Sequence, residues 1–360
     1  MPATGSGDDK AVESADDGFA ERLRMYSMLI GSILSFKVPR FAINTMVPFI
    51  VADLGLPRSV TPGLLAAFHP GYIATQVPVA YLVKARGPKY VCSIMLFGSA
   101  ALLALVPRAG SLATGSHTVK VLAMSALMLG MGLFQGPMSP VNSQLARDWM
   151  PRGGGAGGVE RAWAQRFVSL SHNICPLLAA LFTPRIAERY GWRAVCYIYA
   201  AVGGGFLGLW RLMASNKPVT TVRLEQQQQQ ASSSGGGGSA KKPLFDWRIL
   251  RTRPALALGL FHLASDIGDF TRHQLGPTIF LEKFKCTPVQ MGSWLALGNA
   301  ANIPAGLIWA TVESMLIRRN VEPLAIRRFF CCAASGMEAA LFLCYAFAPT
   351  PLLGTLCYGA

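Results

Sequence analysis

Residues 27–50 read SMLIGSILSFKVPRFAINTMVPFI, an apolar run that contains only two charged side chains, Lys37 and Arg40. About 20 such residues form a helix that is long enough to cross the roughly 30 Å hydrocarbon core of a bilayer. A charge near the middle of such a helix costs about 2.5–3.5 kcal/mol, so a charge that is kept there indicates a specific role. The stretch therefore predicts a membrane-spanning helix with a cationic centre.

Similar apolar runs recur along the whole chain. Hydrophobic residues make up 52% of the sequence and charged residues only 14%, whereas a soluble domain carries about 25% charged residues. We predict further spans at residues 64–83, 91–106, 122–145, 167–186, 194–213, 254–280, 291–313 and 329–348. A tenth apolar run begins at Leu352 and is cut short at Ala360, so we expect a C-terminally truncated sequence. The sequence predicts an all-α membrane protein.

The spans fall into two groups separated by a polar segment that is rich in Gln, Ser and Gly and unable to form a core. Lys and Arg are concentrated in the segments that would share one side with the N-terminus and this linker, which predicts that this side is cytoplasmic. Two helical bundles with a long linker are typical of transporters whose site lies between the halves. The predicted parts are a polar tail (1–24), a six-helix bundle (25–213), a flexible cytoplasmic linker (214–242) and an incomplete C-terminal bundle (243–360).

Several other functions are disfavoured. The net charge of +15 could indicate a nucleic-acid binder, but the basic residues flank apolar segments, so we expect a lipid bilayer and no nucleic acid as partner. The eight cysteines include no C-x-x-C pair, and no motif of a known catalytic site occurs, so we expect neither an enzyme nor a metal site. We expect a monomer without a cofactor, apart from a co-transported H⁺ or Na⁺. The host membrane, plasma or organellar, stays undetermined.

The two charges of the first span are candidates for binding an anionic solute. Lys37 and Arg40 lie three residues apart on one helical face, beside Pro39, which can bend the helix. A guanidinium that faces a water-filled cleft binds a carboxylate or phosphate through two parallel hydrogen bonds. Alternatively, one of the two side chains extends to the membrane surface or pairs with an acid on a neighbouring helix.

A second cluster of polar residues lies in the seventh span. Asp266, Asp269 and His273 share one helical face, and a carboxyl group that is desolvated there could carry a coupled proton. Alternatively, Asp269 forms a self-neutralising pair with Arg272 or His273. In the fourth span, the amide of Gln135 either contacts substrate or makes a structural hydrogen bond.

Several segments together resemble the anion/cation symporter family of the major facilitator superfamily, which includes vesicular glutamate transporters, sialin and phosphate transporters. The resemblance rests on RFAINTMVPFIVADLG (40–55), AFHPGYIATQVP (67–78) and GLFQGPMSPVNSQLARDWMP (132–151), with Glu160 and Arg161 after them. It implies a major facilitator two-bundle fold, anion recognition by Arg40, and substrate contacts by Tyr72 and Gln76, which stand in the family's GY-x-x-x-Q-x-P pattern. Gln135 stands where the family usually has a protonatable glutamate, and Met128 where many members have an arginine.

Together these observations predict a secondary active transporter of a small anion, such as inorganic phosphate or a carboxylate such as glutamate, that works by alternating access and is coupled to a cation. Two alternatives stay open. One is a non-transporting or truncated paralogue or sensor of the same fold, and the other is a major facilitator carrier for another class of solute.

Overall fold

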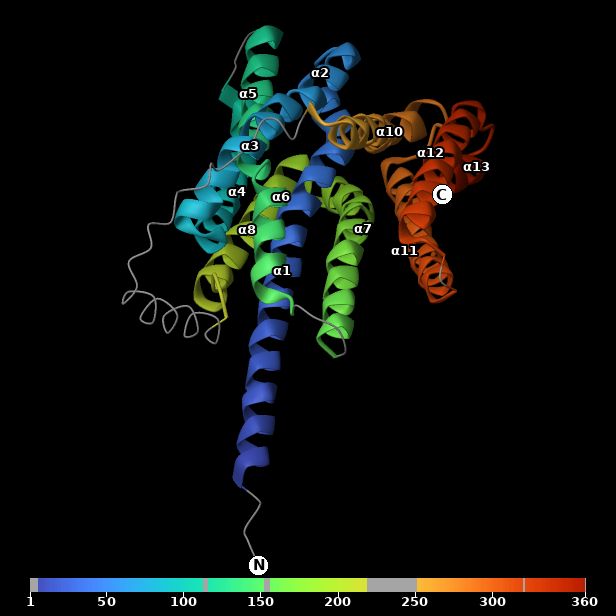
Figure 1. Ribbon diagram of the computed structural model, residues 1–360. Coiled ribbons are helices and arrows are strands. Elements are labelled where there is room, and N and C mark those ends of the chain that lie inside the picture. Colours follow the sequence, from blue (N-terminus) through green and yellow to red (C-terminus); the bar gives the residue numbers. More distant parts are fainter. Residues whose placement is uncertain (1–5, 113–115, 152–155, 219–250, 320, 360) are drawn as a thin grey trace, which may run out of the picture.

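The computed structural model describes residues 6–112, 116–151, 156–218, 251–319 and 321–359, and the regular elements of these ranges are all helices (Figure 1). The predicted linker 214–242 lies mostly outside the described residues, and the predicted polar tail 1–24 is helical from residue 6 onward. The elements are α1 (Ser6–Asp53), η1 (Arg58–Val60), α2 (Thr61–Ala66), α3 (Phe68–Arg86), α4 (Pro88–Leu112), α5 (His117–Gln135), α6 (Met138–Trp149), α7 (Ala156–Tyr190), α8 (Trp192–Met213), α10 (Arg253–Glu282), α11 (Pro288–Arg318), α12 (Pro323–Phe347) and α13 (Pro351–Gly359).

Six helical stretches are long and apolar enough to cross a membrane: Pro88–Ser111, His117–Trp149, Glu160–Tyr190, Trp192–Met213, Pro288–Glu313 and Leu324–Phe347. The other three predicted spans fall in α1, α3 and α10 and are less apolar. These three helices carry the polar and aromatic side chains that line the internal cavities described below. Their lower hydrophobicity therefore follows from what they face inside the protein.

Two predicted spans are interrupted at prolines. The second is divided between α2 and α3, because Pro70 has no N–H group to bond the carbonyl oxygen of Ala66. The Nδ1 atom of His69 lies 3.3 Å from that oxygen and takes over this role. The fourth is divided between α5 and α6 at Gly136 and Pro137. Both breaks occur where a proline removes a backbone donor from the helix.

The N-terminal helices form a closely packed bundle with two apolar clusters. One includes Met46, Ile50 and Val106 near the end of α1, and the other includes Phe36 and Trp210 nearer the linker. Helices α3 and α5 approach so closely that a Cβ atom at Gly132 would collide with the backbone of Phe68 and Tyr72. Small residues at such crossings are characteristic of helix packing in membranes.

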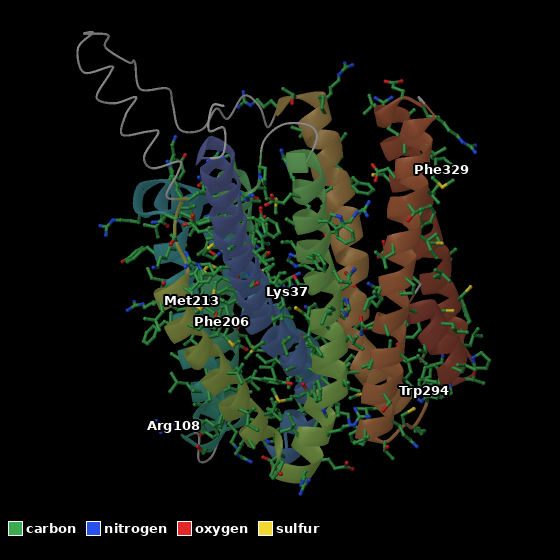
Figure 2. The ribbon with its side chains drawn as sticks, turned by 90° about the horizontal axis from the view of Figure 1, so that it is seen from below. Lys37, Arg108, Phe206, Met213, Trp294 and Phe329 are labelled. Atoms are coloured by element: carbon green, nitrogen blue, oxygen red, sulfur yellow. The ribbon has the colours of Figure 1, made fainter. Side chains whose placement is uncertain are left out.

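The C-terminal helices α10–α13 lie beside α1 and α7, as Figures 1 and 2 show. The main contact joins α7 to α11, and a third apolar cluster includes Ala180 of α7, Phe280 of α10 and Leu295 of α11. We call this junction, with α1 and α7 on one side and α10 and α11 on the other, the seam. The linker face is the end that carries Lys89 and Asn216, and the distal face is the opposite end, where α1 and α10 end.

Candidate functional site

Arg40 lies on the seam, half-buried, on the face of α1 that is turned toward α3 and α10. Its guanidinium carbon lies 4.4 Å from the ring centroid of Phe68 and 5.3 Å from that of Tyr72. Such cation–π contacts contribute about 0.5–2 kcal/mol each and stabilise the positive charge without neutralising it. The two rings are nearly parallel, with an interplanar angle of 27°, so they present a combined aromatic surface to the cation.

A small cavity adjoins Arg40 at the centre of the seam. It draws its lining from both halves of the chain: Arg40, Ile43, Asn44, Leu65, Phe68, Met128, Met131 and Gln274. Its volume is about 20 Å³, and a cavity needs at least about 10–15 Å³ to hold one water molecule. In this conformation the cavity beside Arg40 therefore has room for about one water molecule.

The other predicted substrate-binding residues, Tyr72, Gln76 and Gln135, are not among the residues that line this cavity. Tyr72 stacks on Phe68, and Gln76 lies half-buried one turn further along α3. Gln135 follows Met128 and Met131 on the same face of α5, by the spacing i, i+3, i+7. Its side chain is only 3% exposed, and its amide nitrogen donates no hydrogen bond to any residue that the structure describes. A buried donor of this kind indicates a place for water or a ligand.

A hydrogen bond across the seam joins His69 of α3 to Gln274 of α10, with 3.2 Å between the two Nε2 atoms. The contact between His69 Nδ1 and the Ala66 carbonyl oxygen requires the Nδ1 atom to donate. In the neutral ring, Nε2 is then an acceptor and can receive the amide proton of Gln274. Sequence reasoning missed Gln274 and Phe68, which no spacing pattern links to Arg40. It also missed Asn44, although the i, i+4 spacing from Arg40 places both residues on one face of α1.

The predicted coupling residues lie on α10. The backbone is helical through Asp266 and Asp269, but their side chains lie outside the described residues. His273 is buried, and its Nδ1 atom lies 2.9 Å from the hydroxyl oxygen of Tyr358 on α13. Its ring also contacts Phe41 of α1, with the ring centroids 4.8 Å apart. His273 therefore sits between α1 and the last described helix.

Arg272 and Lys37 are the two other cations near the seam that the sequence singled out. Arg272 donates to the carbonyl oxygen of Tyr358 at 2.9 Å, so it helps to hold α13 against α10. Lys37 lies one turn before Arg40 on α1 (Figure 2). Lys37, Arg40 and Asn44 follow one another along a single face of α1.

A larger cavity, of about 400 Å³, lies between α7 and α11 toward the linker face. Its lining includes Arg166 and Asn173 from α7 and Glu313 from α11. Toward the distal face the same two helices are in close contact, and Arg185 donates to the hydroxyl oxygen of Ser293 at 3.0 Å. Between α7 and α11 the seam is thus hollow toward the linker face and closely packed toward the distal face.

Comparison with known proteins places the chain in a family. The model of the Major Facilitator Superfamily matches residues 28–360. The crystal structure of a D-xylose-proton symporter matches with a TM-score of 0.59 at 14% sequence identity, covering 94% of this chain and 78% of that one, which shows a shared fold.

Curated relatives include several transport proteins. Probable anion transporter 4, chloroplastic, of Oryza sativa subsp. japonica is 21% identical over 358 residues, which is 98% of this chain and 57% of the relative. Sialin of Homo sapiens is 24% identical over 284 residues, or 74% of this chain and 52% of sialin. Sodium-dependent phosphate transport protein 1, chloroplastic, of Arabidopsis thaliana is 21% identical over 292 residues, or 79% and 54%. The chain spans about half the length of these relatives.

The relatives agree with the resemblance drawn from the sequence motifs, and their names describe transport proteins rather than enzymes. The predicted all-α two-bundle fold agrees with the structural match. With six helical stretches that are able to span a membrane, the chain is a multi-pass integral membrane protein. It belongs to the Major Facilitator Superfamily.

Proposed function

We propose that the protein is a secondary active transporter that moves a small anion, inorganic phosphate or a carboxylate, across its membrane by alternating access. The observation that carries the proposal is the position of Arg40, whose guanidinium adjoins a cavity lined by both halves of the chain. A bidentate guanidinium suits a carboxylate or phosphate group. The names of the relatives, which include an anion transporter and a phosphate transport protein, support the same class of solute.

The cavity around Arg40 explains how binding is linked to movement. Because it now has room for about one water molecule, an anion binds only when the seam has opened on one side. Gln274 brings α10 into the same cavity, so closure of the seam changes the surroundings of the bound anion. This is the geometry that alternating access requires, with the site between two halves that rock against each other.

Coupling to a cation is part of the proposal. Asp266, Asp269 and His273 stay the candidates for carrying a proton, and sodium is the alternative coupling ion. A proton or Na⁺ gradient would supply the free energy to concentrate the anion.

Uptake by the purified chain in proteoliposomes tests the proposal. Labelled phosphate, labelled glutamate and a labelled neutral sugar should be compared under an imposed proton or sodium gradient. We expect the protein to take up one of the two anions. Uptake should be at least tenfold weaker in Arg40→Lys, which keeps the positive charge but cannot form the two parallel hydrogen bonds of a guanidinium. Arg40→Ala should show no uptake. Arg108→Ala is the matched control, because Arg108 is an exposed arginine at the end of α4, away from the seam (Figure 2).

Elution as a single monodisperse peak should show that each variant is folded. Undiminished anion uptake by folded Arg40→Ala would remove the proposed role of Arg40. Uptake of only the sugar would favour a carrier for another solute class. A folded protein that moves none of the three solutes would favour a non-transporting member of the family.

A further inference from the structure

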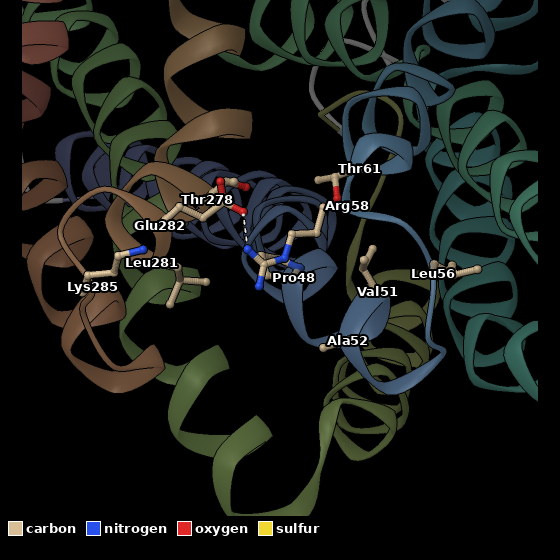
Figure 3. Close-up of a pocket in the computed structure, with 10 residues that line it drawn as sticks. All are labelled: Pro48, Val51, Ala52, Leu56, Arg58, Thr61, Thr278, Leu281, Glu282 and Lys285. Atoms are coloured by element: carbon tan, nitrogen blue, oxygen red, sulfur yellow. Dashed lines mark hydrogen bonds and ion pairs between the residues drawn. The ribbon is translucent and has the colours of Figure 1, made fainter.

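A separate cavity, of about 490 Å³, opens at the distal face between the end of α1 and the end of α10 (Figure 3). Sites for small molecules have volumes of about 300–1,000 Å³, so this cavity has room for a solute. Its polar lining consists of Arg58, Thr61, Thr278, Glu282 and Lys285. Neither the motifs nor the residues around Arg40 account for it.

This distal cavity is stacked on the Arg40 cavity along two helices. On α1, Arg40 and Asn44 line the inner cavity, whereas Pro48 and Ala52 line the distal one. These four positions recur every four residues and therefore share one face of the helix.

The same succession occurs on α10. Gln274 lines the inner cavity, and Thr278 and Glu282 line the distal one, again at steps of four residues. One face of each helix thus leads from the distal mouth to Arg40. The distal cavity therefore follows the Arg40 cavity along both helices.

An ion pair crosses this mouth. The Nη1 atom of Arg58 lies 3.3 Å from the Oε1 atom of Glu282, and 84% of the Arg58 side chain and 49% of the Glu282 side chain are exposed. Exposed pairs of this kind contribute little to stability, with a median of about 0–1 kcal/mol. An incoming anion can therefore replace the Glu282 carboxylate at small cost.

The two partners are anchored to different halves of the molecule. The segment before Arg58 is fixed to α8, because the carboxylate of Asp53 accepts a hydrogen bond from Trp192 at 3.1 Å and forms an ion pair with Arg193 at 2.9 Å. Glu282 is the last residue of α10. Breaking the pair therefore removes a direct link between the two halves.

A second cation faces the same cavity. Lys285 lines it from the loop after α10 and has a left-handed backbone conformation, with φ of 54°, which is unusual for a residue other than glycine. Hydrogen bonds from the backbone nitrogen atoms of Phe284 and Cys286 to α10 carbonyl oxygens hold this loop. Lys283, in contrast, donates to the carbonyl oxygen of Ala346 at 2.7 Å and is engaged with α12.

We propose that the distal cavity is a receiving site for a small oxyanion, a carboxylate or a phosphate, which replaces Glu282 at the guanidinium of Arg58 and takes the ammonium group of Lys285 as a second contact. Two cations against one carboxylate give this lining a net positive charge, and the apolar walls concentrate its field. The exchange opens the mouth that leads to Arg40. The identity of the anion rests on the proposed function, but binding at this site does not require transport.

Calorimetric titration of the purified chain with inorganic phosphate, and separately with glutamate, tests the site. Arg40→Ala serves as the background, so that the inner site does not contribute. In this background we expect Glu282→Gln to bind the anion about two- to fivefold more tightly, because the competing carboxylate is gone. Arg58→Ala should bind at least about tenfold more weakly, and Lys285→Ala should also weaken binding.

Arg108→Ala is the control for surface charge and should leave the affinity within about twofold of the background. The proposal is overturned if Glu282→Gln does not tighten binding, or if Arg108→Ala weakens it as much as Arg58→Ala does. Loss of uptake in Arg40→Ala together with unchanged affinities in the Arg58 and Glu282 variants would refute the distal site alone. Retained binding in a chain that transports none of the tested solutes would refute the transport proposal alone.

Discussion

Helices α4 and α12 have the same length, 25 residues each, and both are apolar enough to cross a membrane, yet their surroundings differ. In α4, 56% of the most apolar stretch is buried within the protein, whereas in α12 only 6% of the corresponding stretch is buried. Hydrophobicity therefore decides that both helices enter the bilayer, but it does not decide what they contact there. Close packing needs small residues and polar contacts at the right positions, and the N-terminal bundle supplies them.

The N-terminal bundle and the C-terminal helices therefore have different structural roles. The N-terminal bundle is held by its own core and fixes the position of Arg40. The helices α10–α12 turn large apolar side chains outward, such as Phe329 and Leu343, which a bilayer would cover. This part contributes Gln274, Glu282 and Lys285 to the cavities of the seam, and it packs against the N-terminal bundle mainly through the contact between α11 and α7.

The strongest test of this contrast is a pair of glycine substitutions. Gly132→Leu should abolish folding of the N-terminal bundle, because a side chain there collides with the backbone of α3 at Phe68 and Tyr72. Gly336→Leu on α12 should be tolerated, since among the described residues no heavy atom outside the backbone of α12 itself lies within 4 Å of the added Cβ position. Size-exclusion chromatography of fluorescent fusions measures both outcomes. Similar folded yields for the two variants would contradict the contrast.

The next largest expected effect is a difference in the rate at which cysteines of the two regions react with a maleimide. Cys92, Cys175 and Cys196 are buried in the N-terminal bundle, whereas Cys331, Cys332 and Cys344 are exposed on α12. A membrane-permeant maleimide should label the α12 group faster by on the order of 100-fold, since the buried thiols react only after local opening of the bundle. Peptide mass spectrometry over a time course gives the rates. Equal rates in detergent, with the fold intact, would show that the bundle is as open as α12.

The smallest expected effect is a difference in stability between variants of two ion pairs, one in the N-terminal bundle and one at the distal cavity. Glu160 accepts from Arg22 at 2.7 and 3.0 Å and from the hydroxyl of Tyr26 at 2.9 Å, inside the N-terminal bundle. Glu160→Gln should lower the free energy of unfolding by about 2–3 kcal/mol, because partly buried charged groups lose their partner.

Glu282→Gln, at the exposed pair with Arg58, should lower the free energy of unfolding by no more than about 1 kcal/mol. Thermal unfolding followed by intrinsic fluorescence compares the two variants. A larger loss of stability in Glu282→Gln would mean that the distal pair is a structural link rather than an exchangeable contact.

Much of the fold was predictable, because apolar length and periodicity are local properties of the chain. Seven of the nine predicted spans each fall on a single helix, and the other two are each divided between two helices at a proline. Pro70 divides the second predicted span and Pro137 the fourth. The helix of α1 also extends back to Ser6, well before the apolar run. Polar residues can continue a helix once packing has formed it, so the end of the apolar pattern did not mark the end of the helix.

The site was predictable only in part. The placement of Tyr72 near Arg40 followed from a sequence resemblance, and the structure brings the two together. The cavity that Arg40 shares with Gln274 of α10 and the two bridges between the halves did not follow from the sequence. His69 and Gln274 are 205 residues apart in the chain, and Arg58 and Glu282 are 224 apart. Such pairs depend on how two separately formed halves dock, and no local pattern in one half encodes its partner in the other.

The stacking of two cavities along one face of α1 also has an electrical consequence. From Ala52 to Arg40 the helix rises by about 18 Å at 1.5 Å per residue, which is more than half of the roughly 30 Å hydrocarbon thickness. A passenger with one uncompensated negative charge would cross about 60% of the membrane voltage on that path, or about 1.4 kcal/mol at 100 mV. With this arrangement, the charge of the co-transported ion determines whether the transport cycle carries a net current.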